Sequence, residues 1–283
     1  MNNKQGIRGG VCERLCIALS LFFRKIFRFE SPFDLLDLQK QESLLEDNIN
    51  RGDIFIHRFA QSLDVEGKIV LELGCSYGGL QAALLHEGAA RTIGLDLDYH
   101  ALSFGRKKLD QKQDIMLLAA DAHYIPFPPS SVDVVVSDSV FEHLQDIEQT
   151  LREIAHVLCP KGRLYAYFGP TWFTYNGPHL IKCISIPWVH LFFSRKTIVN
   201  VLTYYKKKAT FPPSYLEAKI ADFQRMGRLS LRKFHRAVKA SGLDVIQETN
   251  ASPNLLKRNL ARLPVFKELL AGEIHVILEK PDR

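Results

Sequence analysis

The sequence predicts an α/β protein whose central sheet is mostly parallel and covered by helices on both faces. Between residues 49 and 168, short apolar runs alternate with segments of helical periodicity, which is the order of repeated strand–helix–strand units. The run Val134-Val135-Val136, closed by Ser137, has the uninterrupted apolar character of a central parallel strand. A glycine-containing turn follows the first run and acids follow the next two, at the edge where ligands of such sheets bind.

The chain of 283 residues suits one large domain that carries an insertion. Five scattered cysteines show no metal-ligand spacing, so we expect no bound metal, and their odd number favours a reducing cytoplasm. No apolar run reaches the roughly 18 residues that a membrane-spanning helix needs. We divide the chain into N-terminal helices (1–48), a ligand-binding core (49–168), a basic aromatic cap (169–228) and the C-terminal part of the core (229–283).

The N-terminal segment 11–29 is basic and rich in apolar residues. It could lie on the anionic inner leaflet of a membrane, with Arg24, Lys25 and Arg28 towards the headgroups. The alternative is a helix that packs on the domain or on a second subunit. Because no small-residue cleavage site follows, a signal peptide is disfavoured. Residues 33–62 then show amphipathic helical spacing.

The first strand, expected at 68–73, runs into Glu72-x-Gly74-x-Ser76-x-Gly78, and a helix is expected from about residue 78 to 86. A dinucleotide site of the NAD type has Gly-x-Gly-x-x-Gly there, which brings backbone N–H groups onto a pyrophosphate. The carboxylate of Glu72 would repel a pyrophosphate but suits the cationic amino-acid part of a sulfonium nucleoside. The turn therefore favours a sulfonium nucleoside over a dinucleotide.

The remaining core elements follow in regular order. Asp96 ends the second strand, and Asp121 follows the third. We expect further strands at 91–96, 115–118, 132–137, 163–168, 243–249 and 273–279, and helices at 99–109, 150–158, 231–240 and within 251–271.

These motifs resemble the class I S-adenosylmethionine-dependent methyltransferases, closest to the type-11 methyltransferase domain group, over about residues 50–168, 229–249 and 272–280. The chain departs from the group at Ser76, where glycine is frequent. The resemblance implies a Rossmann-like sheet of seven strands with the last one antiparallel and inserted between its neighbours, and lid helices before the first strand. It implies S-adenosyl-L-methionine as cofactor, bound by Glu72, Gly74, Cys75, Ser76, Gly78, Asp96, Leu97, Asp121, Ala122, Ser137 and Ser139. The alternative is a Rossmann-like domain whose glycines only make a tight turn.

The insertion after the fifth strand is strongly basic. Residues 161–240 hold fifteen Lys and Arg against Glu217 and Asp222, a local charge of +13 in a chain of net charge +6. Such a field concentrates anions, and in this family the insertion lies at the mouth of the cofactor cleft. We therefore expect an anionic acceptor or surface, while the alternative is a solvated basic face.

The first half of the insertion is aromatic. The residues that we expect to face the substrate are Trp172, Tyr175, Asn176, His179 and His190. The stretch resembles a Gly-Pro-His-Leu … Pro-Trp-x-His pattern of methyltransferases near polysaccharide and lipid-glycan pathways. The alternative is that its Trp and Phe side chains form a hydrophobic core.

Methyl transfer is an in-line displacement at a sulfonium carbon, so the protein must mainly position the nucleophile. An oxygen nucleophile also benefits from a base. The candidate catalytic residues are His143, His179 and Asp138. In the alternative, His143 orients its loop and Asp138 caps the following helix.

We therefore expect O-methylation of a small-molecule, saccharide or lipid-linked acceptor, in the cytoplasm or peripherally on the inner leaflet of the membrane. An RNA methyltransferase is a second hypothesis, although no RNA-binding module is recognisable and we disfavour a nucleic-acid partner. A third is a non-catalytic, membrane-associated binding protein with the same fold.

Overall fold

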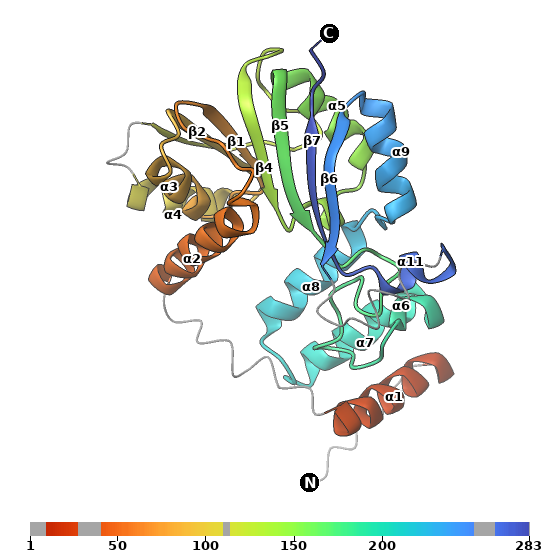
Figure 1. Ribbon diagram of the computed structural model, residues 1–283. Helices are drawn as coiled ribbons and strands as arrows, with labels where there is room; N and C mark the ends of the chain where they lie inside the picture. Colours follow the sequence, from red (N-terminus) through yellow and green to blue (C-terminus); the bar gives the residue numbers. More distant parts are fainter. Residues whose placement is uncertain (1–9, 28–40, 110–113, 252–263, 283) are drawn as a thin grey trace.

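The computed structural model describes residues 10–27, 41–109, 114–251 and 264–282. Its centre is a seven-stranded sheet in the order β3-β2-β1-β4-β5-β7-β6, in which β7 is antiparallel to both neighbours (Figure 1). The predicted mostly parallel sheet with an inserted antiparallel last strand is thus confirmed. The strands are β1 (Ile69–Leu73), β2 (Arg91–Asp96), β3 (Ile115–Ala119), β4 (Val132–Asp138), β5 (Leu158–Phe168), β6 (Asp244–Ala251) and β7 (Glu273–Glu279).

Helices cover both faces of this sheet. The described helices are α1 (Val11–Phe27), α2 (Gln41–Phe59), α3 (Gly79–His86), α4 (Tyr99–Leu109), α5 (Ile147–Val157), α6 (Val189–Phe192), α7 (Arg195–Lys207), α8 (Pro213–Arg225), α9 (Leu231–Ser241) and α11 (Pro264–Leu270). Helix α5 begins three residues before the expected start at residue 150, since the Asp146 carboxylate caps it by accepting the N–H groups of Glu148 and Gln149.

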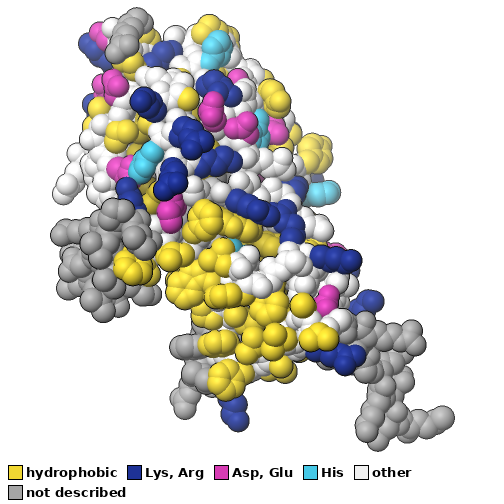
Figure 2. Space-filling view, turned by 90° about the vertical axis from the view of Figure 1, so that its right-hand side faces the viewer, with side chains coloured by type: hydrophobic (Ala, Val, Ile, Leu, Met, Phe, Trp, Pro, Cys, Tyr) yellow, Lys and Arg dark blue, Asp and Glu magenta, His cyan; other side chains and the backbone are white. Residues whose placement is uncertain are grey.

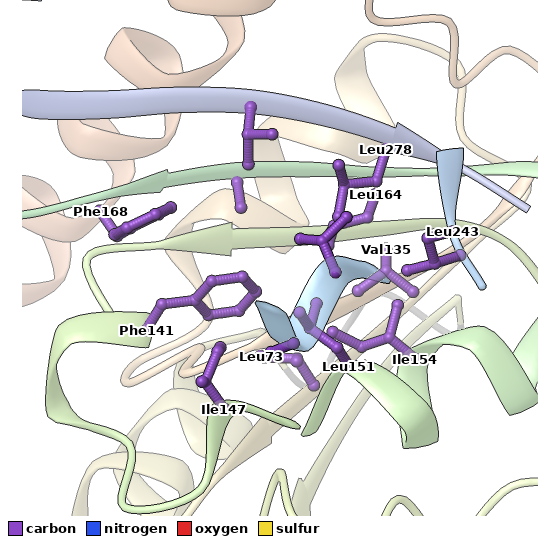
Figure 3. Close-up of a cluster of buried hydrophobic side chains, with 14 of the residues drawn as sticks. Leu73, Val135, Phe141, Ile147, Leu151, Ile154, Leu164, Phe168, Leu243 and Leu278 are labelled. Carbon is purple, nitrogen blue, oxygen red and sulfur yellow. The ribbon is translucent and has the colours of Figure 1, made fainter. Parts of the chain in front are cut away.

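Successive side chains of a strand point to opposite faces of the sheet, so the sheet has a separate hydrophobic core on each face. On one face Leu71 and Leu73 of β1 pack with α5 and α9, and Figure 3 shows Phe141, Ile147 and Leu151 pointing into this cluster. On the other face Val70 packs with side chains of α2 and α3. Because successive strand residues point to opposite faces, one short apolar strand serves both layers.

The boundary between α5 and β5 also differs from the one expected. Helix α5 ends at Val157 and β5 begins at Leu158, five residues before the expected start. The reason is that Leu158 is fully buried and pairs with Val132, which draws the chain into the sheet. The expected helices at 33–62 and 251–271 are described only as α2 and α11, because residues 33–40 and 252–263 lie outside the described part of the chain.

The insertion forms a cap with its own core beyond the carboxyl ends of the strands (Figure 1). Trp172, Leu180 and Ile198 belong to this core, and Cys16 and Ile17 of α1 join it. Helix α1 therefore packs on the cap, whereas α2 packs beside α3, where the Asn48 side chain accepts the N–H of Gly79 at 2.7 Å. No helix in the described ranges is both long and apolar enough to cross a bilayer.

Candidate active site

A cavity of about 800 Å³ opens at the carboxyl ends of β1 to β4. Its wall combines the turn after β1, the segments after β2, β3 and β4, and the end of α8. A smaller cavity of about 340 Å³ lies at the opposite ends of the strands, beside Lys68 and Asp133. Since open α/β sheets bind ligands at the carboxyl ends of their strands, the larger cavity is the candidate site.

The turn after β1 requires glycine at its first position. Gly74 has a φ of +78°, and a Cβ there would lie 2.2 Å from Cγ2 of Val140 on the cavity wall. The N–H of Gly74 donates to the carbonyl of Leu95 at 2.7 Å, which joins the turn to β2. Gly78, with a φ of +82°, then leads into α3. The backbone therefore approaches the cavity with no side chain in between.

Asp96 links the turn to the end of β2. Its carboxylate accepts the N–H of Ser76 at 2.7 Å and the N–H of Asp98 at 2.8 Å. A carboxylate has about four acceptor positions, so capacity remains for hydroxyls of a ligand in the cavity. The neighbouring Leu97 lines the cavity and is 68% exposed, which offers an apolar surface to a planar base.

Asp121 and Ala122 line the same cavity after β3. The Asp121 carboxylate accepts the N–H of His123 at 2.9 Å and contacts its ring nitrogen Nδ1 at 2.5 Å. Burial works against ionisation of Asp121, but these hydrogen bonds outweigh it and lower its pKa. The structure thus brings together Gly74, Asp96 and Asp121, as the sequence predicts.

Three other predicted cofactor residues lie behind the wall. Glu72 is 4% exposed and accepts a hydrogen bond from Nε2 of Gln81 at 2.5 Å. Burial raises the pKa of Glu72 to about 8, and the charges of Asp138 and Asp96 add to the effect. Cys75 and Ser137 are also buried, and burial raises the pKa of the Cys75 thiol. None of the three lines the cavity. The expected contact of the Glu72 carboxylate with the cationic part of the cofactor is therefore not present, because the side chain is buried against Gln81 of α3.

Asp138, at the end of β4, is engaged by two arginines. Its carboxylate lies 3.7 Å from Arg51 and 3.5 Å from Arg58, and it accepts the hydroxyl of Ser139 at 3.1 Å. Arg58 is held in turn by the ring of Tyr167, 3.7 Å from the guanidinium carbon. Asp138, Ser139 and Arg51 all line the cavity. Asp138 thus helps to anchor α2 over the site.

His143 occupies the other end of the cavity, on a 3₁₀ turn after β4. Its Nδ1 lies 2.9 Å from the Asp222 carboxylate of α8. Burial disfavours the imidazolium, but Asp222 outweighs it and holds the pKa of His143 above its ordinary value. The ring of His179 stacks on His143, with centroids 5.2 Å apart, and burial lowers the pKa of His179 to about 4.

The loop that carries His179 has a defined conformation. His179 has a φ of +54°, and its N–H donates to the carbonyl of Asn176 at 2.8 Å. The Asn176 side chain accepts the N–H of Ile181 at 3.0 Å. Asn176, expected to face the substrate, is thus used in shaping the loop that presents His179.

The other expected substrate residues are not brought to the cavity wall together. Trp172 is 6% exposed in the cap core, with Phe223 stacked on it at 6.0 Å. His190 packs edge-on against Trp172 at 4.9 Å, and burial lowers its pKa to about 4. Tyr175 is 45% exposed. For Trp172 the expected alternative, a place in a hydrophobic core, describes the structure.

Sequence reasoning missed four residues at the site, which are Arg51, Glu142, Asp222 and Arg225. Asp222 carried a signal, because it is one of two acids in a basic stretch of 80 residues. Arg225 belonged to the basic cluster already noted. Nothing local marks Arg51, which reaches the site only through the packing of α2.

Comparison with known proteins agrees with the fold and with the cofactor half of the site. Residues 71–166 match the family model described as a methyltransferase domain. A fatty-acid O-methyltransferase of Mycolicibacterium smegmatis is 34% identical over 118 residues, 41% of this chain and 43% of that protein. The phthiotriol/phenolphthiotriol dimycocerosates methyltransferase of Mycobacterium leprae is 32% identical over 130 residues, 44% of this chain and 47% of that protein.

Among solved structures, the geranyl diphosphate C-methyltransferase of Streptomyces coelicolor A3(2) covers 86% of this chain and 85% of its own, with a TM-score of 0.52 and 12% identity. This likeness concerns the fold alone. The curated relatives are matched over less than half of their own length. The family match, residues 71–166, does not include the cap or the N-terminal helices.

Proposed function

Residues 71–166 form a class I S-adenosylmethionine-dependent methyltransferase domain, and from this premise we propose that the protein methylates an oxygen of a small-molecule, saccharide or lipid-linked acceptor. One observation carries the proposal. A single cavity joins the turn and acids that suit S-adenosylmethionine to a second end, formed by the 3₁₀ turn and the cap. Donor and acceptor can therefore meet in one cavity.

The donor half is held by this chain's backbone and carboxylates. Gly74 lets the methionine part lie against the chain, Asp96 accepts ribose hydroxyls, and Asp121 with Ala122 meets the adenine edge. Leu97 supplies an apolar surface for the ring. When bound, the sulfonium supplies an activated methyl group, so the protein's task is alignment of the nucleophile.

The acceptor half is polar and carries basic groups. His143 and Asp222 line it, and the positive charges of Arg51 and Arg225 on the same wall are offset by Asp138 and Asp222. The support for an anionic acceptor is therefore the basic charge of the surrounding cap sequence, since arginine pairs well with carboxylates and phosphates. An acceptor hydroxyl seated at His143 would face the transferred methyl from the end of β4.

A lipid acceptor is supported by α1 and by the matched relatives. The two relatives described above are named for a fatty acid and for dimycocerosates. Helix α1 buries Cys16 and Ile17 in the cap, yet Val11, Leu15 and Phe22 on its outer side are 83%, 51% and 58% exposed. Figure 2 shows hydrophobic side chains gathered over the lower part of one face, where Figure 1 places the cap.

We propose that this outer side of α1 docks on an anionic bilayer. The exposed Lys25 supports docking, whereas Arg24, expected to face the headgroups, turns inward and donates to the carbonyl of Cys183 at 3.0 Å. Arg28 lies outside the described residues. The packing of Arg24 explains how the helix stays bound to the cap while its other side remains free.

Vesicle sedimentation tests the docking. Phe22→Glu should abolish binding to vesicles of phosphatidylcholine with phosphatidylglycerol. Ile54→Glu, which changes a 51% exposed residue of α2, should leave binding intact. Equal binding of both variants, or no binding of the wild-type protein, would refute docking through α1.

Transfer of radiolabelled methyl from S-adenosylmethionine tests the reaction. Lipid extracts, saccharide fractions and total RNA from the source cells are the acceptors to be compared. Asp96→Ala, assayed at a cofactor concentration too low to saturate it, is the control with weakened cofactor binding. We expect label in the lipid or saccharide fraction, either as an alkali-stable methyl ether or as an alkali-labile methyl ester. Label confined to RNA would support the RNA methyltransferase instead, and no label above the control in any fraction would count against the enzyme.

A further inference from the structure

Two neighbouring side chains and a third from a distant part of the sequence meet beside the acceptor end of the cavity. One possible ligand atom from each of Glu142, His143 and His179 lies within 4.8 Å of the others. Glu142 and His143 belong to the 3₁₀ turn after β4, whereas His179 comes from the cap. Cysteine and histidine spacing along the chain could not reveal this cluster, because the fold creates it.

Two members of the cluster have buried polar atoms that no side chain pairs. Glu142 is 2% exposed, and its carboxylate is approached by the backbone N–H groups of Glu142 and Gly169 but by no side-chain donor of the described residues. Nε2 of His179 is likewise buried and unpartnered there. A buried polar atom without a partner costs about 1–3 kcal/mol, so a buried carboxylate and a buried imidazole nitrogen that no side chain pairs are suited to a bound ion.

His143 is already oriented as a ligand would be. The hydrogen bond of its Nδ1 to Asp222 leaves Nε2 as the nitrogen with a free lone pair. A carboxylate that accepts the other ring N–H is the usual support of a metal-bound histidine. Lys219 is the nearby cation that acts on both histidines, and the carboxylates of Glu142 and Asp222 oppose it.

We propose that Glu142, His143 and His179 bind one divalent metal ion, with Zn²⁺ preferred, and leave a coordination position open towards the cavity. Two imidazoles and one carboxylate form a common catalytic zinc set. In a tetrahedral site with ligand atoms about 2.0–2.2 Å from the ion, those atoms lie about 3.3–3.6 Å apart. The three side chains, whose possible ligand atoms lie within 4.8 Å of one another, therefore need to close by up to about 1.5 Å.

This inference rests on the proposed function and deepens it. A hydroxyl of the acceptor would occupy the open position, and the ion would lower its pKa so that its proton leaves to water. The oxygen lone pair then forms the new O–CH₃ bond. The S–CH₃ bond breaks, and its electron pair stays on the sulfur, which loses its positive charge. His143 and His179 act here as ligands, in place of the general base expected of either.

The site is tested by adding zinc to the chelator-treated protein and measuring its binding by titration calorimetry and elemental analysis. We expect one Zn²⁺ per chain in the wild-type protein, with none retained by Glu142→Gln or His179→Ala. Asp222→Asn should weaken binding by about 10- to 100-fold, as a positioning residue does. His190→Ala is the matched control, because His190 is a partly buried cap histidine whose ring nitrogens also lack partners. It should bind like wild type.

Two further measurements, the absorption of bound Co²⁺ and the melting temperature with Zn²⁺, distinguish loss of the metal site from loss of the fold. Co²⁺ should give visible d–d absorption with wild type and His190→Ala, and none with the two ligand variants. Zn²⁺ should raise the melting temperature of the wild-type protein and of His190→Ala, and should leave that of the two ligand variants unchanged. Equal zinc binding by wild type and Glu142→Gln, or loss in His190→Ala alone, would overturn the site.

S-adenosylhomocysteine binding, measured on the same samples, separates the two proposals. Cofactor binding without zinc binding would overturn the metal site and leave the methyltransferase intact. Zinc binding without cofactor binding would overturn the methyltransferase and leave the metal site intact. Loss of methyl transfer in His179→Ala, with no zinc in the wild-type protein, would assign His179 to the transfer itself and overturn the ion.

Discussion

Replacing Glu72 by Gln should stabilise the protein at alkaline pH and change its stability little at acidic pH. Glu72 is fully enclosed beneath the turn, and burial raises its pKa from 4.5 to about 8. Gln has nearly the same shape, and its carbonyl can still accept the hydrogen bond of Gln81. The substitution therefore removes the ionisation and little else.

The size of the effect follows from the two pKa values. Below pH 4.5 the carboxyl of Glu72 is protonated in both states, so no penalty arises. Between pH 4.5 and 8 the unfolded chain releases a proton that the folded chain keeps, and the free energy of unfolding falls by about 1.4 kcal/mol per pH unit. Above pH 8 the loss levels off, on the order of 5 kcal/mol.

Urea denaturation of both proteins from pH 5 to pH 9 measures this difference. The contributions of other titrating groups cancel when the free energies of unfolding of the two proteins are subtracted at each pH. Glu87→Gln, which changes an exposed glutamate next to α3, is the control for removal of a carboxylate. A difference for Glu72→Gln that stays constant across the range would refute the buried, protonated carboxyl.

Three further substitutions test the turn and the helix cap. Gly74→Ala should weaken S-adenosylhomocysteine binding at least about tenfold by calorimetry, because the new methyl meets Val140 at 2.2 Å and the φ is +78°; unchanged affinity would contradict the close approach. Asp96→Ala should weaken it about 10- to 100-fold, the size of one or two charged hydrogen bonds, and wild-type affinity would exclude ribose binding there. Asp146→Ala should cost about 1 kcal/mol of unfolding free energy in urea, and no loss would show that the cap is dispensable.

The core of the fold was predictable because local patterns determine it. Strands β1, β2 and β7 begin and end within one residue of the expected positions, since each is a short apolar run bounded by turn residues. Asp96 and Asp121 could be assigned to one site because parallel strands end at one edge. The early start of β5 was missed because Pro160 and Gly162 are typical of a turn, whereas the burial of Leu158 extends the strand.

The acceptor half was less predictable, because it depends on contacts between distant segments. His143 and His179 were each recognised as candidates, but their stacking follows from how the cap folds over the 3₁₀ turn. The pairing of His143 with Asp222 joins residues 79 apart. Trp172 was expected at a substrate surface and lies in the cap core, since aromatic residues suit both places.

Titration of the wild-type protein with S-adenosylhomocysteine tests whether the carboxyl ends of β1 to β3 form a site for a sulfonium nucleoside. We expect one site per chain, with a dissociation constant between about 1 μM and 1 mM, and competition by S-adenosylmethionine but not by NAD. An absence of heat up to about 1 mM ligand, or displacement by NAD, would contradict it.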